Sequence, residues 1–169
     1  EFSIPPFDQI QKEHYIPAFE KGIEQEKKEI EAIVENKDDP NFENTLEALG
    51  ESGMLLRKVS NVFNVLNGSM TDEEMQKIDQ QVTPLLSNHR DDILFNEGLF
   101  QRIKTVYGQR NQLDLTQEQA TLLEKYYKDF IRGGANLSQE KKDELRKINE
   151  ELSNLTMKFG QHVLKENNR

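Results

Sequence analysis

Three histidines are the residues of this chain best suited to metal binding or proton transfer, and they lie far apart in the sequence. His14 follows Glu13, His89 precedes Arg90 and two aspartates, and His162 lies near the carboxyl end. None belongs to an H-E-x-x-H pair, in which two imidazoles one helical turn apart bind one metal ion. We therefore interpret all three as surface or helix-edge histidines and predict no metal-binding residue in this chain.

Carboxylates and serines, which also serve in catalysis, have simpler structural interpretations here. Glu24, Lys28 and Glu31 share one helix face and are predicted to form a solvated charge ladder. No G-x-S-x-G motif marks a serine nucleophile, and serines such as Ser60 and Ser138 fall in helix or cap positions. The chain has no cysteine, which excludes disulfides, thiolate metal ligands and cysteine nucleophiles.

Two pairs of adjacent residues could bind a ligand or could have a purely structural role. Gly133-Gly134 after Arg132 could cradle an anion, but the Lys-Ser or Lys-Thr of a phosphate-binding loop is absent. We predict instead that the two glycines end a helix. Tyr126-Tyr127 could stack on a ligand, yet their helical spacing with other apolar residues favours core packing. The residue types alone predict a scaffold without a catalytic, cofactor-binding or metal site.

Composition limits the partners and the number of domains. The 169 residues carry 31 Asp plus Glu against 22 Lys plus Arg, and the net charge of −9 opposes binding to nucleic acid or anionic lipid. No apolar run approaches the ~20 residues of a membrane span, and no signal peptide is visible. We expect a soluble protein, cytoplasmic or periplasmic, with one domain over residues 1–169. Because the chain starts at Glu1 and not at methionine, we expect that an upstream segment has been removed.

Apolar residues recur at helical spacing along nearly the whole chain, and no segment of strand length alternates with period two. This pattern predicts an all-α, bundle-like fold of six mostly antiparallel helices. The first ten residues should be extended, because each of Pro5 and Pro6 pushes its predecessor out of the helical region. Helices are expected over about Lys12–Val34 and Phe42–Leu66, the second ending near Gly68.

Four further helices are expected to begin after side chains that can cap them. Glu74 and Gln119 each stand three residues after a threonine and complete two capping boxes. Pro84 lies inside a helical pattern and should kink that helix. The four predicted N-caps are Thr71, Asn96, Thr116 and Ser138.

The last predicted helix carries an apolar stripe with 3-4-3-4 spacing. Such a stripe suits antiparallel packing inside one bundle, which is the interpretation that we favour because the connections between helices are short. A coiled-coil seam between two chains has the same spacing and is the alternative. The stripe consists of Leu145, Ile148, Leu152, Leu155 and Phe159.

Several segments stand in a consistent order along the chain. They are IPPFDQIQKEHYIPAF at 4–19, FENTLEAL at 42–49, VSNVFNVLN at 59–67, NEGLF at 96–100, FIRGGANL at 130–137 and LSNLTMKFGQHVL at 152–164. Together they resemble the amino-terminal part of the thimet oligopeptidase family, which includes oligopeptidase A. The segments 13–19 and 130–137 are most similar to the bacterial peptidyl-dipeptidase (Dcp) branch of that family.

The resemblance implies a zinc peptidase that removes dipeptides from the carboxyl end of short peptides. An oligopeptidase that cuts internally, or a free-standing helical interaction module, is the alternative. In such enzymes an H-E-x-x-H helix and a downstream Glu hold the metal, and the Glu of the motif activates the bound water. Those residues are expected beyond Arg169, so zinc belongs to the parent protein and no site residue is assigned here. The resemblance also implies that this segment forms part of a channel wall, with the remainder of its own polypeptide as partner.

Overall fold

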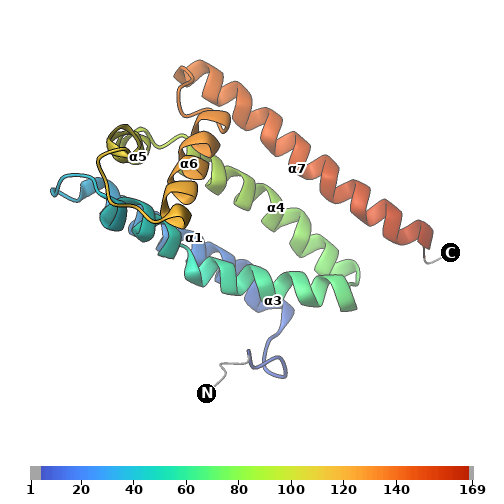
Figure 1. Ribbon diagram of the computed structural model, residues 1–169. Coiled ribbons are helices and arrows are strands. Elements are labelled where there is room, and N and C mark those ends of the chain that lie inside the picture. Colours follow the sequence, from blue (N-terminus) through green and yellow to red (C-terminus); the bar gives the residue numbers. More distant parts are fainter. Residues whose placement is uncertain (1–4, 168–169) are drawn as a thin grey trace.

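The computed structural model describes residues 5–167, and every regular element in that range is helical (Figure 1). A 3-10 turn, η1 (Lys12–His14), leads into the first helix, and a π-helical turn, η2 (Phe42–Glu47), leads into the second. The predicted all-α fold is therefore confirmed. The helices are α1 (Tyr15–Glu35), α2 (Ala48–Glu51), α3 (Met54–Met70), α4 (Glu73–Leu94), α5 (Glu97–Gln109), α6 (Gln117–Arg132) and α7 (Gln139–Asn167).

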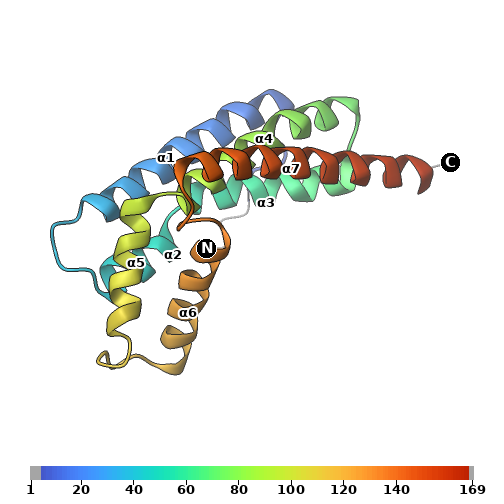
Figure 2. The ribbon, with the colours of Figure 1, turned by 90° about the horizontal axis from the view of Figure 1, so that it is seen from above.

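The long helices lie side by side, and the shorter ones cross them at one end. Figure 2 shows α1, α3, α4 and α7 extending together, whereas α5 and α6 project from the end where α1 finishes. The contacting pairs α1/α3 and α4/α7 run in opposite directions, as predicted for a mostly antiparallel arrangement. Because α7 contacts α4 at the edge of this group, one side of α7 has no neighbouring helix in the described chain.

Two clusters of buried apolar side chains hold the helices α1 to α6 together. The first packs the end of α1 against η2, α2, α5 and α6, and it includes Leu46, Leu99, Ile103, Leu123 and Phe130. The second packs the start of α1 against α3 and α4, and it includes Tyr15, Phe19, Leu56, Phe63, Met75, Ile78 and Val82. Both clusters consist of residues that recur every three or four positions, so each helix contributes one apolar face.

The second predicted helix, over Phe42–Leu66, is interrupted near its middle. Ser52 leaves the helical region with φ −62° and ψ 156°, and Gly53 follows with φ 68°, a left-handed conformation that favours glycine. The N–H of Gly53 donates to Oε2 of Glu29 at 2.8 Å. The prediction of one continuous helix is therefore wrong. The break was not visible in the pattern, because the apolar spacing is helical on both sides of it.

The junction between α3 and α4 also differs from the prediction. α3 continues for two residues beyond Gly68, so this glycine does not end the helix. Thr71 does not cap α4, because its hydroxyl donates to Oδ1 of Asn67 at 3.0 Å. Asp72 is the N-cap instead, and its Oδ1 accepts two N–H groups of the first turn at 3.1 and 2.9 Å. A carboxylate at this position also interacts favourably with the positive end of the helix dipole.

The other predicted helix ends are confirmed. Asn96 Oδ1 accepts the N–H of the third residue of α5 at 2.9 Å, and Thr116 forms a complete capping box with Gln119 at the start of α6. The hydroxyl of Ser138 accepts an N–H in the first turn of α7 at 3.4 Å. Gly133 caps α6, and the next glycine has φ 101°. The helix α4 is unbroken through its internal proline.

The chain before η1 is not extended throughout, as had been predicted for the first ten residues. Residues 1–4 lie outside the described part of the structure. Phe7–Gln9 form a turn in which the N–H of Gln9 donates to the carbonyl of Pro6 at 2.9 Å. The prediction is wrong for this turn, because a proline restricts the residue before it, so Pro5 and Pro6 do not hold residues 7–9 in the extended region.

Candidate functional site

The three histidines are separated in space as well as in sequence. His14 is exposed before α1, and its Nδ1 accepts the backbone N–H of Gln11 at 3.1 Å. His162 is exposed on α7, whereas His89 is buried in α4. Among residues 5–167, no group of three or more His, Asp or Glu side chains is arranged to hold a metal ion.

His89 is only 4% exposed, so its interpretation as a surface or helix-edge residue is wrong. Its Nε2 lies 2.8 Å from Oε2 of Glu26 on α1. The same carboxylate lies against Gly53, where a Cβ would come within 2.3 Å of Oε1 of Glu26. The carboxylate of Glu26 therefore bonds to α4 and packs against the residue that precedes α3. With two side chains that contact each other and no third candidate ligand in the described chain, this pair connects helices and does not fit a zinc site.

The hydrogen bonds and ion pairs between α7 and α4 come from polar side chains on the face of α7 beside its apolar stripe. Nδ2 of Asn149 donates to Oδ1 of Asp91 at 2.8 Å. The guanidinium of Arg146 lies 2.8 Å from Oδ1 of Asp92, and it also donates to the carbonyl of Asn88 at 3.0 Å. These contacts determine which face of α7 is turned toward α4.

Burial raises the pKa of two carboxyl groups on α4. Asp91 is 2% exposed, and desolvation raises its pKa although Asn149 donates to Oδ1 and arginines lie nearby. Its Oδ2 has no hydrogen-bond partner within residues 5–167. Asp79 is half-buried, and desolvation raises its pKa despite a 3.3 Å hydrogen bond from Thr83 Oγ1. Shifted carboxyl groups occur at functional sites and also in structural networks, so their surroundings decide between the two.

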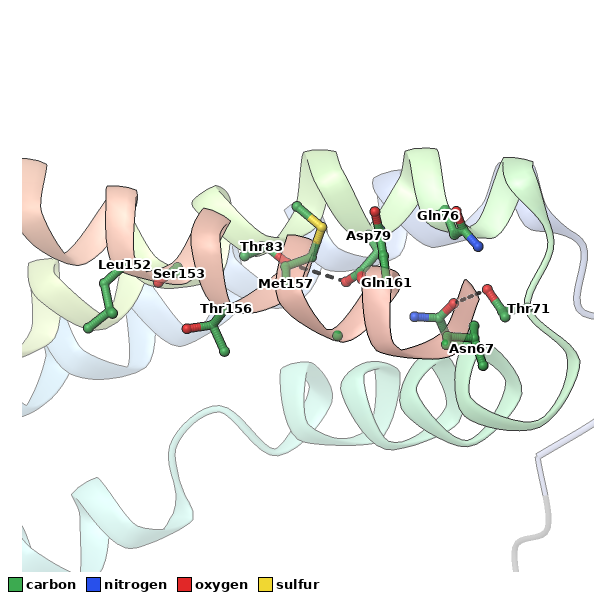
Figure 3. Close-up of a pocket in the computed structure, with 12 residues that line it drawn as sticks. Asn67, Thr71, Gln76, Asp79, Thr83, Leu152, Ser153, Thr156, Met157 and Gln161 are labelled. Carbon is green, nitrogen blue, oxygen red and sulfur yellow. Dashed lines mark hydrogen bonds between the residues drawn. The ribbon is translucent and has the colours of Figure 1, made fainter. Parts of the chain in front are cut away.

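A groove of about 580 Å³ surrounds Asp79 between the end of α3, the first half of α4 and the second half of α7 (Figure 3). Leu152 and Thr156 of α7 line one side of it, and Asn67 of α3 and Thr71, just after α3, line the other. The lining side chains include amides, hydroxyls and one carboxylate, but no histidine, lysine or arginine. The groove can therefore hold a segment by contact and hydrogen bonding.

The apolar stripe of α7 faces away from the two cores. Leu145 is half-buried, whereas the next four members of the stripe are largely exposed. The prediction that the stripe packs inside the bundle is wrong for these four, because α4 contacts the neighbouring polar face of α7. The exposed fractions are 59% for Ile148, 61% for Leu152, 56% for Leu155 and 69% for Phe159.

The charge ladder predicted on the first helix is present. Lys28 Nζ lies 2.6 Å from Oε1 of Glu24, and Glu31 is exposed on the same helix. The aromatic pair on α6 packs against the core, as predicted. Tyr127 stacks on Tyr107 of α5 with ring centroids 3.8 Å apart. These residues therefore have structural partners within the chain.

One buried charge was missed by sequence reasoning. Arg102 of α5 is buried, and its guanidinium donates at 2.9 Å to the carbonyl of Asn36 and at 2.9 Å to Oδ1 of Asn44. It thereby holds the connection between α1 and η2 against α5. The signal was present in the sequence, because Arg102 stands three residues after Leu99 and therefore shares the apolar face of that helix.

The described chain is thus a helical region whose buried charges join one helix to another, and none of its helices is long and apolar enough to cross a membrane. No protein-family model matches the sequence. Individual relatives do. The chain is 39% identical over 166 residues to the dipeptidyl carboxypeptidase of Escherichia coli K12. This match covers 98% of the present chain and 24% of the relative.

Two further relatives match the same extent of the chain. The dipeptidyl carboxypeptidase of Salmonella typhimurium is 38% identical over 163 residues, and oligopeptidase A of the same organism is 26% identical over 163 residues. Each match covers 96% of this chain and 24% of the relative. The chain therefore spans about a quarter of the length of the curated relatives it matches. The predicted resemblance to the amino-terminal region of the thimet oligopeptidase family is confirmed.

Proposed function

We propose that this chain is the helical amino-terminal domain of a zinc peptidase that removes dipeptides from the carboxyl end of short peptides. The observation that carries the proposal is the match over 98% of the chain to a protein named dipeptidyl carboxypeptidase. The identity of 39% to this protein exceeds the 26% to oligopeptidase A over the same extent, which favours the dipeptidase over an internally cutting oligopeptidase.

In this proposal the domain acts by shape. The helices form part of the wall of a channel that admits short unfolded peptides and excludes folded proteins. The exposed stripe of α7 supports this role, because a contiguous apolar surface commonly marks an interface.

The chemistry is assigned to residues outside this chain. Zinc in a peptidase polarises the scissile carbonyl and activates water, and it needs three protein ligands with a base nearby. The histidine and the carboxylate that come together here, His89 and Glu26, bond to each other and supply no third ligand. In the proposed enzyme, His89 and Glu26 hold α1 and α4 in place.

The decisive experiment is to read the source reading frame beyond Arg169 and to assay the protein that it encodes. We expect an H-E-x-x-H segment downstream and stepwise release of carboxyl-terminal dipeptides by the longer protein. Residues 1–169 alone should release none. Internal cleavage products would identify an oligopeptidase instead. A frame that stops at Arg169, or chelator-sensitive peptide cleavage by residues 1–169 with stoichiometric zinc, would overturn the proposal.

A further inference from the structure

The exposed stripe of α7 has the spacing of a coiled-coil seam. Its five apolar residues, from Leu145 to Phe159, occupy alternate a and d positions of the heptad repeat. Four of them are 56–69% exposed, and none of the helices in the described chain covers that side of α7. Isolated exposed apolar residues are common on proteins, but four consecutive members of one heptad seam form a continuous strip.

One edge of this seam is bonded to other parts of the chain, and the other edge is exposed. The edge toward α4 is already engaged, because Asn149 donates to Asp91 and Nζ of Lys142 donates to the carbonyl of Phe95 at 3.1 Å. The opposite edge is exposed and carries four charged residues at seven-residue intervals, acidic in the first half of the helix and basic in the second. These residues are Glu144, Glu151, Lys158 and Lys165.

Most of this charged edge is free to pair with another molecule. Glu144 has an ion pair with Lys141 on its own helix, at 2.8 Å. Glu151, Lys158 and Lys165 have no hydrogen bond or ion pair with any part of the chain in the range that the structure describes.

An antiparallel arrangement of two copies matches both the seam and the charges. A two-fold axis between Leu152 and Leu155 places each of these residues opposite the other in the second copy, and it places Ile148 opposite Phe159. In the same register the exposed edges of the two helices face each other, with Glu151 beside Lys158 of the other copy. A parallel pair would instead bring the exposed edge of one helix against the edge that α4 occupies.

We propose that this chain forms an antiparallel dimer through α7 wherever the stripe is not covered by another part of a longer polypeptide. The occupant of the stripe is a second copy of the chain, and Glu151 and Lys158 determine the direction of pairing. Coverage by a second copy and coverage by the chain's own continuation exclude each other. The proposal does not depend on the peptidase function proposed above.

The test is sedimentation equilibrium of residues 1–169 over a range of concentrations at low salt. We expect a monomer–dimer equilibrium for the unchanged chain. Glu151→Lys and Lys158→Glu should each weaken dimerisation about tenfold, because each change turns two symmetric attractions into repulsions worth together about 1.4 kcal/mol. The double variant Glu151→Lys/Lys158→Glu should restore the dimer to within about threefold of the unchanged chain.

Two further variants separate this seam from unspecific association. Leu155→Glu should abolish the dimer, and because Leu155 is exposed in the monomer, its helical circular dichroism should not change. Lys147→Glu reverses an exposed charge of α7 away from the seam and should leave the dimer intact. A strictly monomeric chain at all concentrations, or a double variant as weak as the single ones, would overturn the proposal.

Discussion

Nε2 of His89 lies 2.8 Å from Oε2 of Glu26, and this contact connects two helices through residues 63 positions apart. Both side chains are largely withdrawn from water, at 5% and 14% side-chain exposure. A hydrogen bond to a charged group in such surroundings contributes more than an exposed one, mainly because either partner left alone would be buried without a bond. The pair is therefore a structural contact between α1 and α4.

Replacing His89 with alanine should destabilise the protein by about 2–3 kcal/mol, because Glu26 loses its partner in a mostly buried position. Glu26→Ala should have a similar effect. The double variant should cost less than the sum of the two single changes, and the difference measures the coupling in a double-mutant cycle followed by urea unfolding. Additive losses would show that the contact contributes nothing to the stability of the helix pair.

Gly53→Ala should destabilise the protein by about 1–3 kcal/mol, because alanine is strained in the left-handed conformation of this residue. The added Cβ would also lie 2.3 Å from the carboxylate of Glu26. Gly68→Ala is the matched control, since Gly68 lies inside α3 with open space around it. That change should stabilise the protein by about 0.5–1 kcal/mol. If the two substitutions changed the stability equally in thermal unfolding, the conformation and the close contact described for Gly53 would not limit this position to glycine.

Phe130→Ala should cost about 3–5 kcal/mol of stability, because the ring is 2% exposed and is stacked beside Phe100 at a centroid distance of 6.0 Å. The adjacent Ile131 is 38% exposed, so Ile131→Ala should cost about 1 kcal/mol or less. Denaturant titration of both variants provides the comparison. A loss below about 1 kcal/mol for Phe130→Ala would place this ring outside the core.

Asp91→Asn should stabilise the protein at neutral pH by about 1 kcal/mol, since a neutral amide avoids the desolvation of a buried carboxylate and can still accept from Asn149. The pKa of Asp91 is raised above its ordinary value of 3.8 in the folded protein. The stability gained from protonating this carboxyl is therefore fully present below pH 3.8 and is lost as the pH rises through the folded-state pKa.

The advantage of Asp91→Asn should accordingly appear at pH 7 and disappear below about pH 3.8. Urea titrations of both proteins at several pH values measure this difference. Asp91→Ala is the control, because it removes the charge together with the acceptor of Asn149 and should not stabilise. A constant difference between Asp91→Asn and the unchanged protein across the pH range would contradict the role given to burial.

Chelation should leave the melting temperature of residues 1–169 unchanged, because the helices are held by the two apolar clusters and by bonds between side chains. A fold that depends on metal loses stability when the metal is removed. Thermal melting with and without EDTA, together with a zinc assay of the purified chain, measures this directly. A fall of several degrees in EDTA would show a structural metal.

Much of this protein followed from its sequence. The recurrence of apolar residues predicted the all-α fold, and the side chains that begin α5, α6 and α7 were identified as caps because capping involves only residues three positions apart. The family resemblance could also be recognised from the sequence, because it rests on short segments that stand in a consistent order along the chain. Local chemistry of this kind needs no knowledge of distant neighbours.

The tertiary structure decided what each helix faces. Periodicity shows that Ile148 and Leu155 share a side of α7, but it does not say whether another helix covers that side. Coverage depends on the polar contacts of Asn149 and Arg146 with α4, which turn the apolar stripe outward. Likewise the partner of the buried His89 is Glu26, which lies on another helix and 63 positions away in the sequence. Burial depends on which helices pack against each other, and the spacing of residues within one helix does not predict that packing.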